Sequence, residues 1–300
     1  MEVEWQKFHF VDGIDVFLFD GYKFSSHPGL SARYPFTYKR AVDILRDLVE
    51  SKISVSAAAR ACIDMFPTEE DGKEDGRGLF GHFLLTMAGQ IPYHHHGQAK
   101  LVRLIMCLYS SAKFGKISEA TLGKGYPTFY SMDQFQISIY ENYVPDLDES
   151  EDRTPGDPLA YNLNTAAFYA RLAQAGFPHM SCYAVAALSD GLEETHDEPQ
   201  YPQYADDLYV SLASLWISYA GQALYTQLVE TRPEDDKAKK HHYKLGKLYK
   251  GPQFGLERWT FWKNALQRAG ENGKAREQAR KLAKRAGDLM EAIERCTQEA

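Results

Sequence analysis

Five side chains able to bind or polarise a ligand stand where helical spacing predicts burial: Asn164, Arg171, Trp216, Tyr219 and Arg258. They belong to three segments, residues 159–174, 205–229 and 256–269, which combine large rings with a few polar groups. A hydrogen-bond donor held rigidly in a dry site can polarise a substrate carbonyl. We therefore predict a cavity between these segments, in which Tyr219 and Arg171 are catalytic and Asn164, Trp216 and Arg258 bind the ligand.

The alternative for the same residues is that they only complete hydrogen bonds of the core. Arg258 and Trp262 are four residues apart, so the guanidinium can lie over the indole of its own helix. A polar stripe in the second segment has the same two interpretations, tight helix packing or the lining of a cavity: Ser211, Ser214, Ser218 and Gln222. Buried polar groups need partners in either case.

Three consecutive histidines, His94 to His96, form the most prominent group of metal-binding side chains. Metal sites on helices place histidines four residues apart, whereas consecutive residues point in different directions. We expect a solvated helix entry here, with a pocket role for one histidine as the alternative. The sequence contains no phosphate-binding glycine loop and no GxSxG nucleophile motif. It therefore predicts neither a metal nor a cofactor.

Composition is that of a globular protein. The chain has 300 residues, of which 44% are hydrophobic and 25% charged. Its 34 Lys and Arg against 41 Asp and Glu give a net charge of −7, which disfavours nucleic acid as a partner. Residues 190–207 hold seven acidic and no basic side chains, and residues 237–250 hold six lysines and no acid. We expect these segments to pair with each other, and phosphate contact by the lysines is the alternative.

Hydrophobic spacing is helical almost throughout from Tyr38 onward. Ala41, Ile44, Leu45 and Leu48 follow the spacing of three and four that marks an amphipathic helix. Ser54 or Ser56 is expected to cap the next helix. We predict an all-α fold, a single compact bundle of about ten helices over residues 36–300. A partly irregular N-terminal extension is expected over residues 1–35.

The segment of residues 208–229 contains no charged side chain and is long enough to span a bilayer. Regularly placed serines and glutamines favour a buried central helix near residues 205–229 instead, so no membrane contact is expected. The N-terminus lacks the basic and apolar pattern of a signal peptide, and the four cysteines are scattered. These features predict a cytoplasmic protein with reduced thiols.

The last predicted helix has the most regular apolar register. Seven residues alternate at spacings of four and three: Ala275, Ala279, Leu282, Ala286, Leu289, Ile293 and Cys296. This heptad seam predicts packing along one long partner helix of the bundle. A homodimer through the same helix is the alternative.

Three groups of residues together carry a family resemblance: Asn162-Leu163-Asn164, then Leu215-Trp216 with Tyr219-Ala220-Gly221, then Gly251-Pro252 with Leu256-Glu257-Arg258-Trp259 and Phe261-Trp262-Lys263. With the segment from Pro92 to Leu101 and the final helix, they resemble the fungal family labelled domain of unknown function 3632. The similarity extends over residues 78–297. The resemblance implies an all-helical intracellular fungal protein in a family of which some members sit among secondary-metabolite genes. It brings no established catalytic residues.

These observations lead to one expected function and one alternative function. We expect a cofactor-independent protein that binds an apolar small molecule and acts on it as a cyclase or isomerase, because such chemistry needs shape and a few donors rather than a nucleophile. The rival is a non-catalytic interaction or regulatory protein that uses its charged loops or its heptad helix. A large pocket with convergent polar groups would distinguish the first from the second.

Overall fold

The computed structural model describes residues 38–66, 77–111, 158–178, 180–199, 201–230 and 243–298, with six single residues: Phe114, Phe135, Ile139, Tyr143, Pro145 and Leu147. Every regular element within these ranges is a helix, which confirms the predicted all-α class. The N-terminal extension expected over residues 1–35 lies outside the described residues. Contacts group the chain into two units, Met1–Asn164 and Thr165–Ala300. The single domain expected over residues 36–300 stays a prediction.

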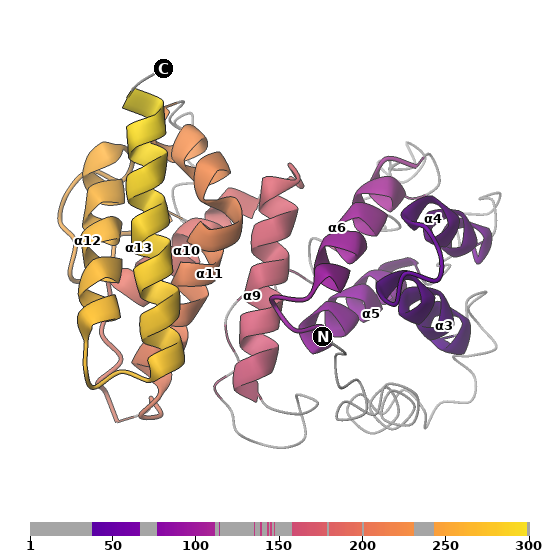
Figure 1. Cartoon of the computed structure of the whole chain (residues 1–300), viewed down its shortest axis with the longest axis horizontal. Helices are drawn as coiled ribbons and strands as arrows, with labels where there is room; N and C mark the ends of the chain where they lie inside the picture. The colour runs from indigo at the N-terminus through magenta and orange to yellow at the C-terminus, as the bar shows by residue number, and fades with distance from the viewer. Residues whose placement is uncertain are drawn as a thin grey trace, which may run out of the picture. The chain divides into compact units, whose positions relative to one another are not determined.

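The described helices of the first unit are α3 (Tyr38–Val49), α4 (Val55–Asp64), α5 (Arg77–Gln90) and α6 (His96–Tyr109). Helices α3, α4 and α6 pack against one another (Figure 1). Ser54 caps α4, because its hydroxyl accepts a hydrogen bond from the Ala57 amide at 3.1 Å. The capping prediction is therefore confirmed for Ser54.

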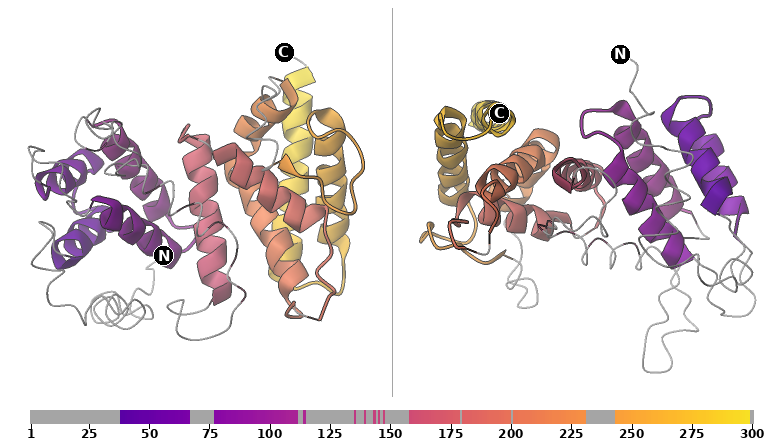
Figure 2. Two further views of the ribbon diagram at one scale, coloured as in Figure 1. Left: turned by 180° about the vertical axis from the view of Figure 1, so that it is seen from behind. Right: turned by 90° about the horizontal axis from the view of Figure 1, so that it is seen from below.

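Helix α9 (Pro158–Gln174) crosses the boundary between the units, since Asn164 is the last residue of the first and Thr165 begins the second. The second unit continues with α10 (Met180–Leu192), α11 (Ala205–Tyr225), the π-helix η4 (Thr226–Glu230), α12 (Leu256–Glu271) and α13 (Glu277–Gln298). Within it, α11 contacts α10, α12 and α13. Seen from behind, α10 lies against α11 (Figure 2).

The serines of α11 are satisfied by their own helix. The hydroxyl of Ser211 donates to the Asp207 carbonyl at 2.6 Å, and Ser214 and Ser218 donate in the same way to the carbonyls of Val210 and Ser214. Ser211 and Ser214 are also buried. Because each hydroxyl has a partner four residues earlier, the polar stripe fits tight helix packing and does not by itself require a cavity.

The predicted continuous helix over residues 205–229 changes its form near the end. Regular α-helix stops at Tyr225, and the last turn is the π-helix η4. The carbonyl of Leu228 in this turn accepts a hydrogen bond at 3.1 Å from the Gly255 amide, just before α12. None of the helices that the structure describes is long and apolar enough to cross a bilayer.

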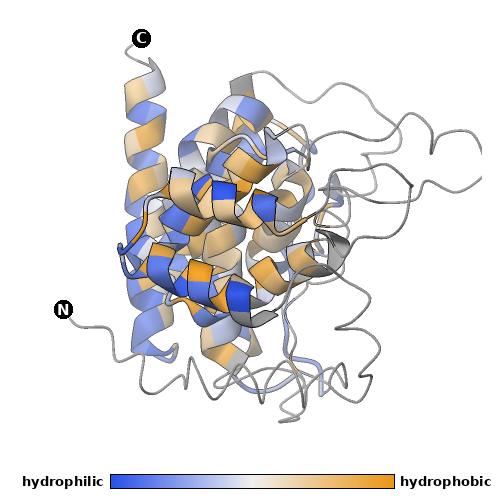
Figure 3. Cartoon of the chain, turned by 90° about the vertical axis from the view of Figure 1, so that its right-hand side faces the viewer, coloured by the Kyte–Doolittle hydropathy of each residue, from blue (hydrophilic) through white to orange (hydrophobic). Residues whose placement is uncertain are grey.

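The seam of α13 faces helices of its own chain. Figure 3 shows apolar and polar bands alternating along α13, and contacts join it to α11 and α12. Four seam residues are buried: Ala279, Leu282, Ala286 and Ile293. A Cβ placed on Gly270 of α12 would lie 3.1 Å from the Lys284 backbone, and one on Gly221 of α11 would lie 3.0 Å from the Ile293 side chain. Small residues therefore let the three helices approach closely.

Leu215 lies on the buried face of α11 and is 1% exposed. We predict that Leu215→Ala lowers the free energy of unfolding by roughly 2–5 kcal/mol, through lost apolar contact and the cavity left behind. Urea melts followed by circular dichroism measure the change. Leu248→Ala is the matched control, because Leu248 is 53% exposed and should lose less than about 0.5 kcal/mol. Equal losses for the two variants would contradict the burial of α11.

Candidate functional site

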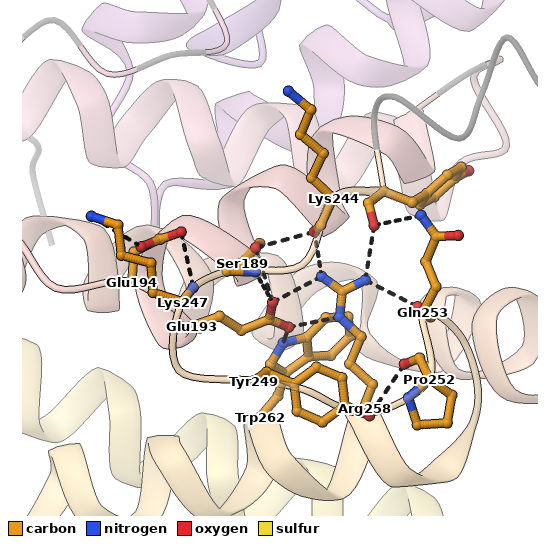
Figure 4. Close-up of polar contacts among 12 residues, drawn as sticks. Ser189, Glu193, Glu194, Lys244, Lys247, Tyr249, Pro252, Gln253, Arg258 and Trp262 are labelled. Carbon is orange, nitrogen blue, oxygen red and sulfur yellow. Dashed lines mark hydrogen bonds and ion pairs between the residues drawn. The ribbon is translucent and has the colours of Figure 1, made fainter.

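Glu193 and Arg258 form a fully buried ion pair in the second unit (Figure 4). Glu193 directly follows α10, and Arg258 lies in the first turn of α12; their side chains are 0% and 1% exposed. Arg258 Nε donates to Glu193 Oε1 at 2.6 Å, and Nη2 donates to Oε2 at 3.0 Å. Two parallel hydrogen bonds between ionised groups are the strongest arrangement that such a pair can adopt.

The Glu193 carboxylate accepts three more hydrogen bonds. Trp262 Nε1 donates to Oε1 at 2.7 Å, while the Gly246 amide and the Ser189 hydroxyl donate to Oε2 at 2.7 and 3.1 Å. Burial alone would raise the pKa of Glu193, but the hydrogen bonds from Arg258 and Gly246 outweigh it and lower the pKa below its usual value. The carboxylate is therefore ionised at neutral pH.

Arg258 uses its remaining donors on backbone carbonyls. Nη2 donates to the Lys244 oxygen at 2.7 Å, and Nη1 donates to the oxygens of Tyr243 and Gln253 at 3.3 and 3.0 Å. Together with the two bonds to Glu193, these account for all five N–H groups of a guanidinium. The guanidinium carbon also lies 4.9 Å from the Trp262 ring centroid, as the spacing of four residues predicts. The ligand-binding role of Arg258 stays a prediction.

The ion pair fixes the segment before α12, residues 243–255, which we call the clamped loop. Besides the bonds to Arg258, the Leu248 amide donates to the Glu193 carbonyl at 2.8 Å. Gln253 Nε2 donates to the Tyr243 carbonyl at 2.8 Å, which closes the loop on itself. A Cβ on Gly246 would lie 2.5 Å from the Glu193 backbone oxygen, so only glycine fits there. The position of Glu193 thus determines the path of the clamped loop.

Arg171 and Tyr219, the two residues predicted to be catalytic, contact each other. The guanidinium carbon of Arg171 on α9 lies 3.5 Å from the ring centroid of Tyr219 on α11. Arg171 Nη1 also donates to the Ala167 carbonyl at 3.2 Å. Burial lowers the pKa of Arg171, an effect that Tyr219 partly opposes. Both side chains are half-buried, so the pair is a partly desolvated cation resting on a ring.

Asn164, which is predicted to bind the ligand, forms hydrogen bonds with residues of the first unit. Asn164 Nδ2 donates to the Gly89 carbonyl at 2.8 Å, and its Oδ1 accepts from the Tyr93 amide at 2.7 Å. Gln98 Nε2 donates to the Asn164 carbonyl at 2.9 Å. The Asn164 side chain therefore pairs with backbone polar groups at the end of α5 and in the turn before α6, all within the first unit. Trp216 is 2% exposed in the second unit. The ligand-binding roles of both stay predictions.

The three histidines lie at the N-terminal end of α6, where the sequence predicted a helix entry, and His96 is the first residue of the helix. His95 is the N-cap, and its Nδ1 accepts a hydrogen bond from the Gly97 amide at 3.1 Å. Burial, together with the neighbouring histidines and Lys100, lowers the pKa of His95 to about 4. A neutral imidazole suits this accepting role at physiological pH. Within the part of the chain that the structure describes, no group of three His, Cys, Asp or Glu side chains could hold a metal.

A second titratable cluster, which the sequence analysis missed, follows α10. The His196 ring stacks on Tyr209 with centroids 4.0 Å apart and planes at 5°. His196 Nδ1 lies 2.9 Å from Asp206 Oδ1. Burial raises the pKa of the nearby Asp190 to about 6, although His196 favours the ionised carboxylate. Glu193 and His196 belong to the acidic residues 190–207, which the sequence analysis expected to pair with the lysines of residues 237–250. The only sequence signal for their burial was their position just after an apolar helix.

Arg258→Met tests the ion pair. The substitution keeps an unbranched apolar stem but leaves the buried Glu193 carboxylate without its cation, so we expect the free energy of unfolding to fall by about 3–5 kcal/mol. The double variant Glu193→Met/Arg258→Met removes both charges and should regain part of that loss in urea melts. Arg268→Met, at an exposed position of α12, serves as the control and should change stability by less than about 0.5 kcal/mol. A double variant less stable than Arg258→Met would contradict this account.

Asp190→Asn tests the effect of burial on that carboxyl. The pKa of Asp190 rises from an ordinary value of 3.8 to about 6, so the folded chain holds this proton more tightly and its stability falls as pH rises between these values. The variant should be more stable than wild type by about 1–3 kcal/mol at pH 8. The gain should shrink towards pH 4. Asp288→Asn, exposed on α13, is the control, and a pH-independent effect of Asp190→Asn would refute the assignment.

The comparisons with known proteins identify the family of the chain and no individual relative. The sequence matches the family described as "Protein of unknown function (DUF3632)" over residues 82–266. Neither the curated proteins nor the solved structures contain a match to the chain. The matched range includes both members of the Glu193–Arg258 pair and of the Arg171–Tyr219 pair. Since the match spans more than half of the sequence, the chain belongs to the DUF3632 family.

Proposed function

We propose that the chain is a cofactor-independent protein that binds an apolar small molecule bearing one carbonyl or anionic oxygen, at the Arg171–Tyr219 pair. The observation that carries this proposal is the guanidinium of Arg171, half-buried and 3.5 Å from the Tyr219 ring centroid. Stacking uses the face of a guanidinium, whereas its N–H donors lie in the plane. The same arginine can therefore rest on the ring and present donors to an oxygen atom.

The environment of the pair supports chemistry on the bound molecule. Burial lowers the pKa of Arg171, which reflects the loss of water around its cation. Hydrogen bonds donated by a partly desolvated cation are stronger than those made in bulk water. A donor held in this way can polarise a carbonyl and contribute about 10²-fold in rate. We accordingly propose a cyclase or isomerase activity, with Tyr219 and Arg171 as the donors.

We also propose that the protein acts in the cytoplasm, within fungal secondary metabolism. The family resemblance implies a fungal protein of secondary metabolism, and the sequence predicts a cytoplasmic location without a nucleic-acid partner. A homodimer through α13 has less support, because four seam residues pack within the chain: Ala279, Leu282, Ala286 and Ile293.

The test uses 8-anilinonaphthalene-1-sulfonate, a probe that joins apolar rings to one anionic group. We expect saturable binding to the folded wild-type chain, measured by fluorescence titration. Arg171→Gln should weaken it about tenfold, since the charge-assisted contact to the sulfonate is lost. Tyr219→Phe keeps the ring and should weaken it less.

Arg268→Gln is the matched control, because Arg268 is an exposed arginine of the same unit. Thermal melts of all variants check that the fold is retained. Equal affinities of wild type, Arg171→Gln and Arg268→Gln for the probe would remove the Arg171–Tyr219 pair from the proposal. Once a substrate is in hand, loss of turnover in Tyr219→Phe at unchanged melting temperature separates a chemical role from a structural one.

A further inference from the structure

The large apolar side chains that are exposed on the described surface come from one short segment of the chain. Leu245, Leu248 and Leu256 are 40%, 53% and 45% exposed, and they are the large hydrophobic residues that the described part of the chain leaves open to water. Two of them belong to the clamped loop and the third begins α12. Single exposed leucines are ordinary, but three of them within twelve residues of one chain segment favour contact with another molecule.

The same segment also carries basic side chains. Lys244, Lys247 and Lys250 are all exposed. Lys247 Nζ lies 3.9 Å from Glu194 Oε2 and 3.4 Å from Glu198 Oε1, so its positive charge is paired with these two carboxylates. Lys244 and Lys250 form no ion pair with any residue in the described ranges. The surface therefore offers two cations and three leucines to a partner.

The backbone beneath this surface is fixed from inside. The amides of Gly246 and Leu248 donate to Glu193, and the Lys247 amide donates to Glu194 Oε1 at 3.1 Å. The carbonyl of Lys244 accepts from Arg258. Figure 4 shows the Lys244 side chain leading away from the buried pair. A loop already held in one conformation loses little entropy when a partner binds, which favours recognition.

We propose that Lys244, Leu245, Leu248, Lys250 and Leu256 form a docking surface for a protein segment that carries acidic side chains beside apolar ones. Charge complementarity supports this partner: Lys244 and Lys250 lack acidic partners in the described chain, and the leucines require apolar contacts. An anionic lipid surface fits less well. The chain has a net charge of −7, and Asp197 and Glu198 are exposed in the segment whose glutamates pair with Lys247.

The experiment uses a phage-displayed library of random 16-residue peptides, selected on the full chain. Peptides that also bind the Leu245→Ser/Leu248→Ser variant are removed. We expect the selected sequences to combine Asp or Glu with Leu, Ile, Phe or Trp. Fluorescence anisotropy of the best peptide should show binding about tenfold weaker for Leu245→Ser/Leu248→Ser and for Lys244→Gln/Lys250→Gln. Higher salt should weaken the wild-type complex.

The control is Lys274→Gln/Lys284→Gln, which removes two exposed lysines of the same unit outside this surface. It should bind the peptide within about twofold of wild type. Thermal melts confirm that every variant is folded, which is expected because all substituted side chains are exposed. Three results would overturn the proposal: no enriched peptide, enriched peptides without acidic residues, or equal losses in the control. Sedimentation with phosphatidylserine vesicles that depends on Leu245 and Leu248 would assign the surface to membranes instead.

Discussion

The ion pair of Glu193 and Arg258 joins the end of α10 to two consecutive segments that lie about fifty residues later in the sequence, the clamped loop and the first turn of α12. Moving two charges out of water costs several kcal/mol for each ion. Here the cost is offset because every N–H group of Arg258 donates a hydrogen bond and because three further groups donate to Glu193. That compensation exists in one geometry only, because a small shift of the loop would leave buried polar atoms unpaired. The pair therefore selects a conformation more than it adds net stability.

Close packing of α10 against α11 places Glu193 within reach of Arg258. Gly191, two residues before it, lies against α11 so closely that a Cβ would be 2.5 Å from the Tyr209 carbonyl. On the other side of α11, Gly221 and the small residues of α13 permit a similar approach. The helices thus fix the end of α10, and the carboxylate that emerges there fixes the clamped loop.

The periodic parts of the fold could be predicted from the sequence, whereas its polar centre could not. The seam of α13 and the contact of Arg258 with Trp262 follow from spacing along a single helix, so one sequence suffices. Residues 190–207 hold seven acidic side chains, and periodicity does not distinguish Glu193 from the other six. Its burial arises from Gly246 and Arg258, which lie more than fifty residues away. The polar stripe of α11 was ambiguous for the same reason, since the sequence does not reveal that each serine bonds to its own helix.

Most anchors of the clamped loop are backbone atoms. Arg258 contacts the carbonyl groups of Tyr243, Lys244 and Gln253, and Glu193 contacts the amides of Gly246 and Leu248. Main-chain groups are the same for every residue type except proline at an amide. Outward residues such as Lys244, Leu245 and Leu248 can therefore be exchanged without loosening the scaffold. This part of the molecule can diverge in what it recognises while its shape stays constant, much as a variable loop does on a fixed framework.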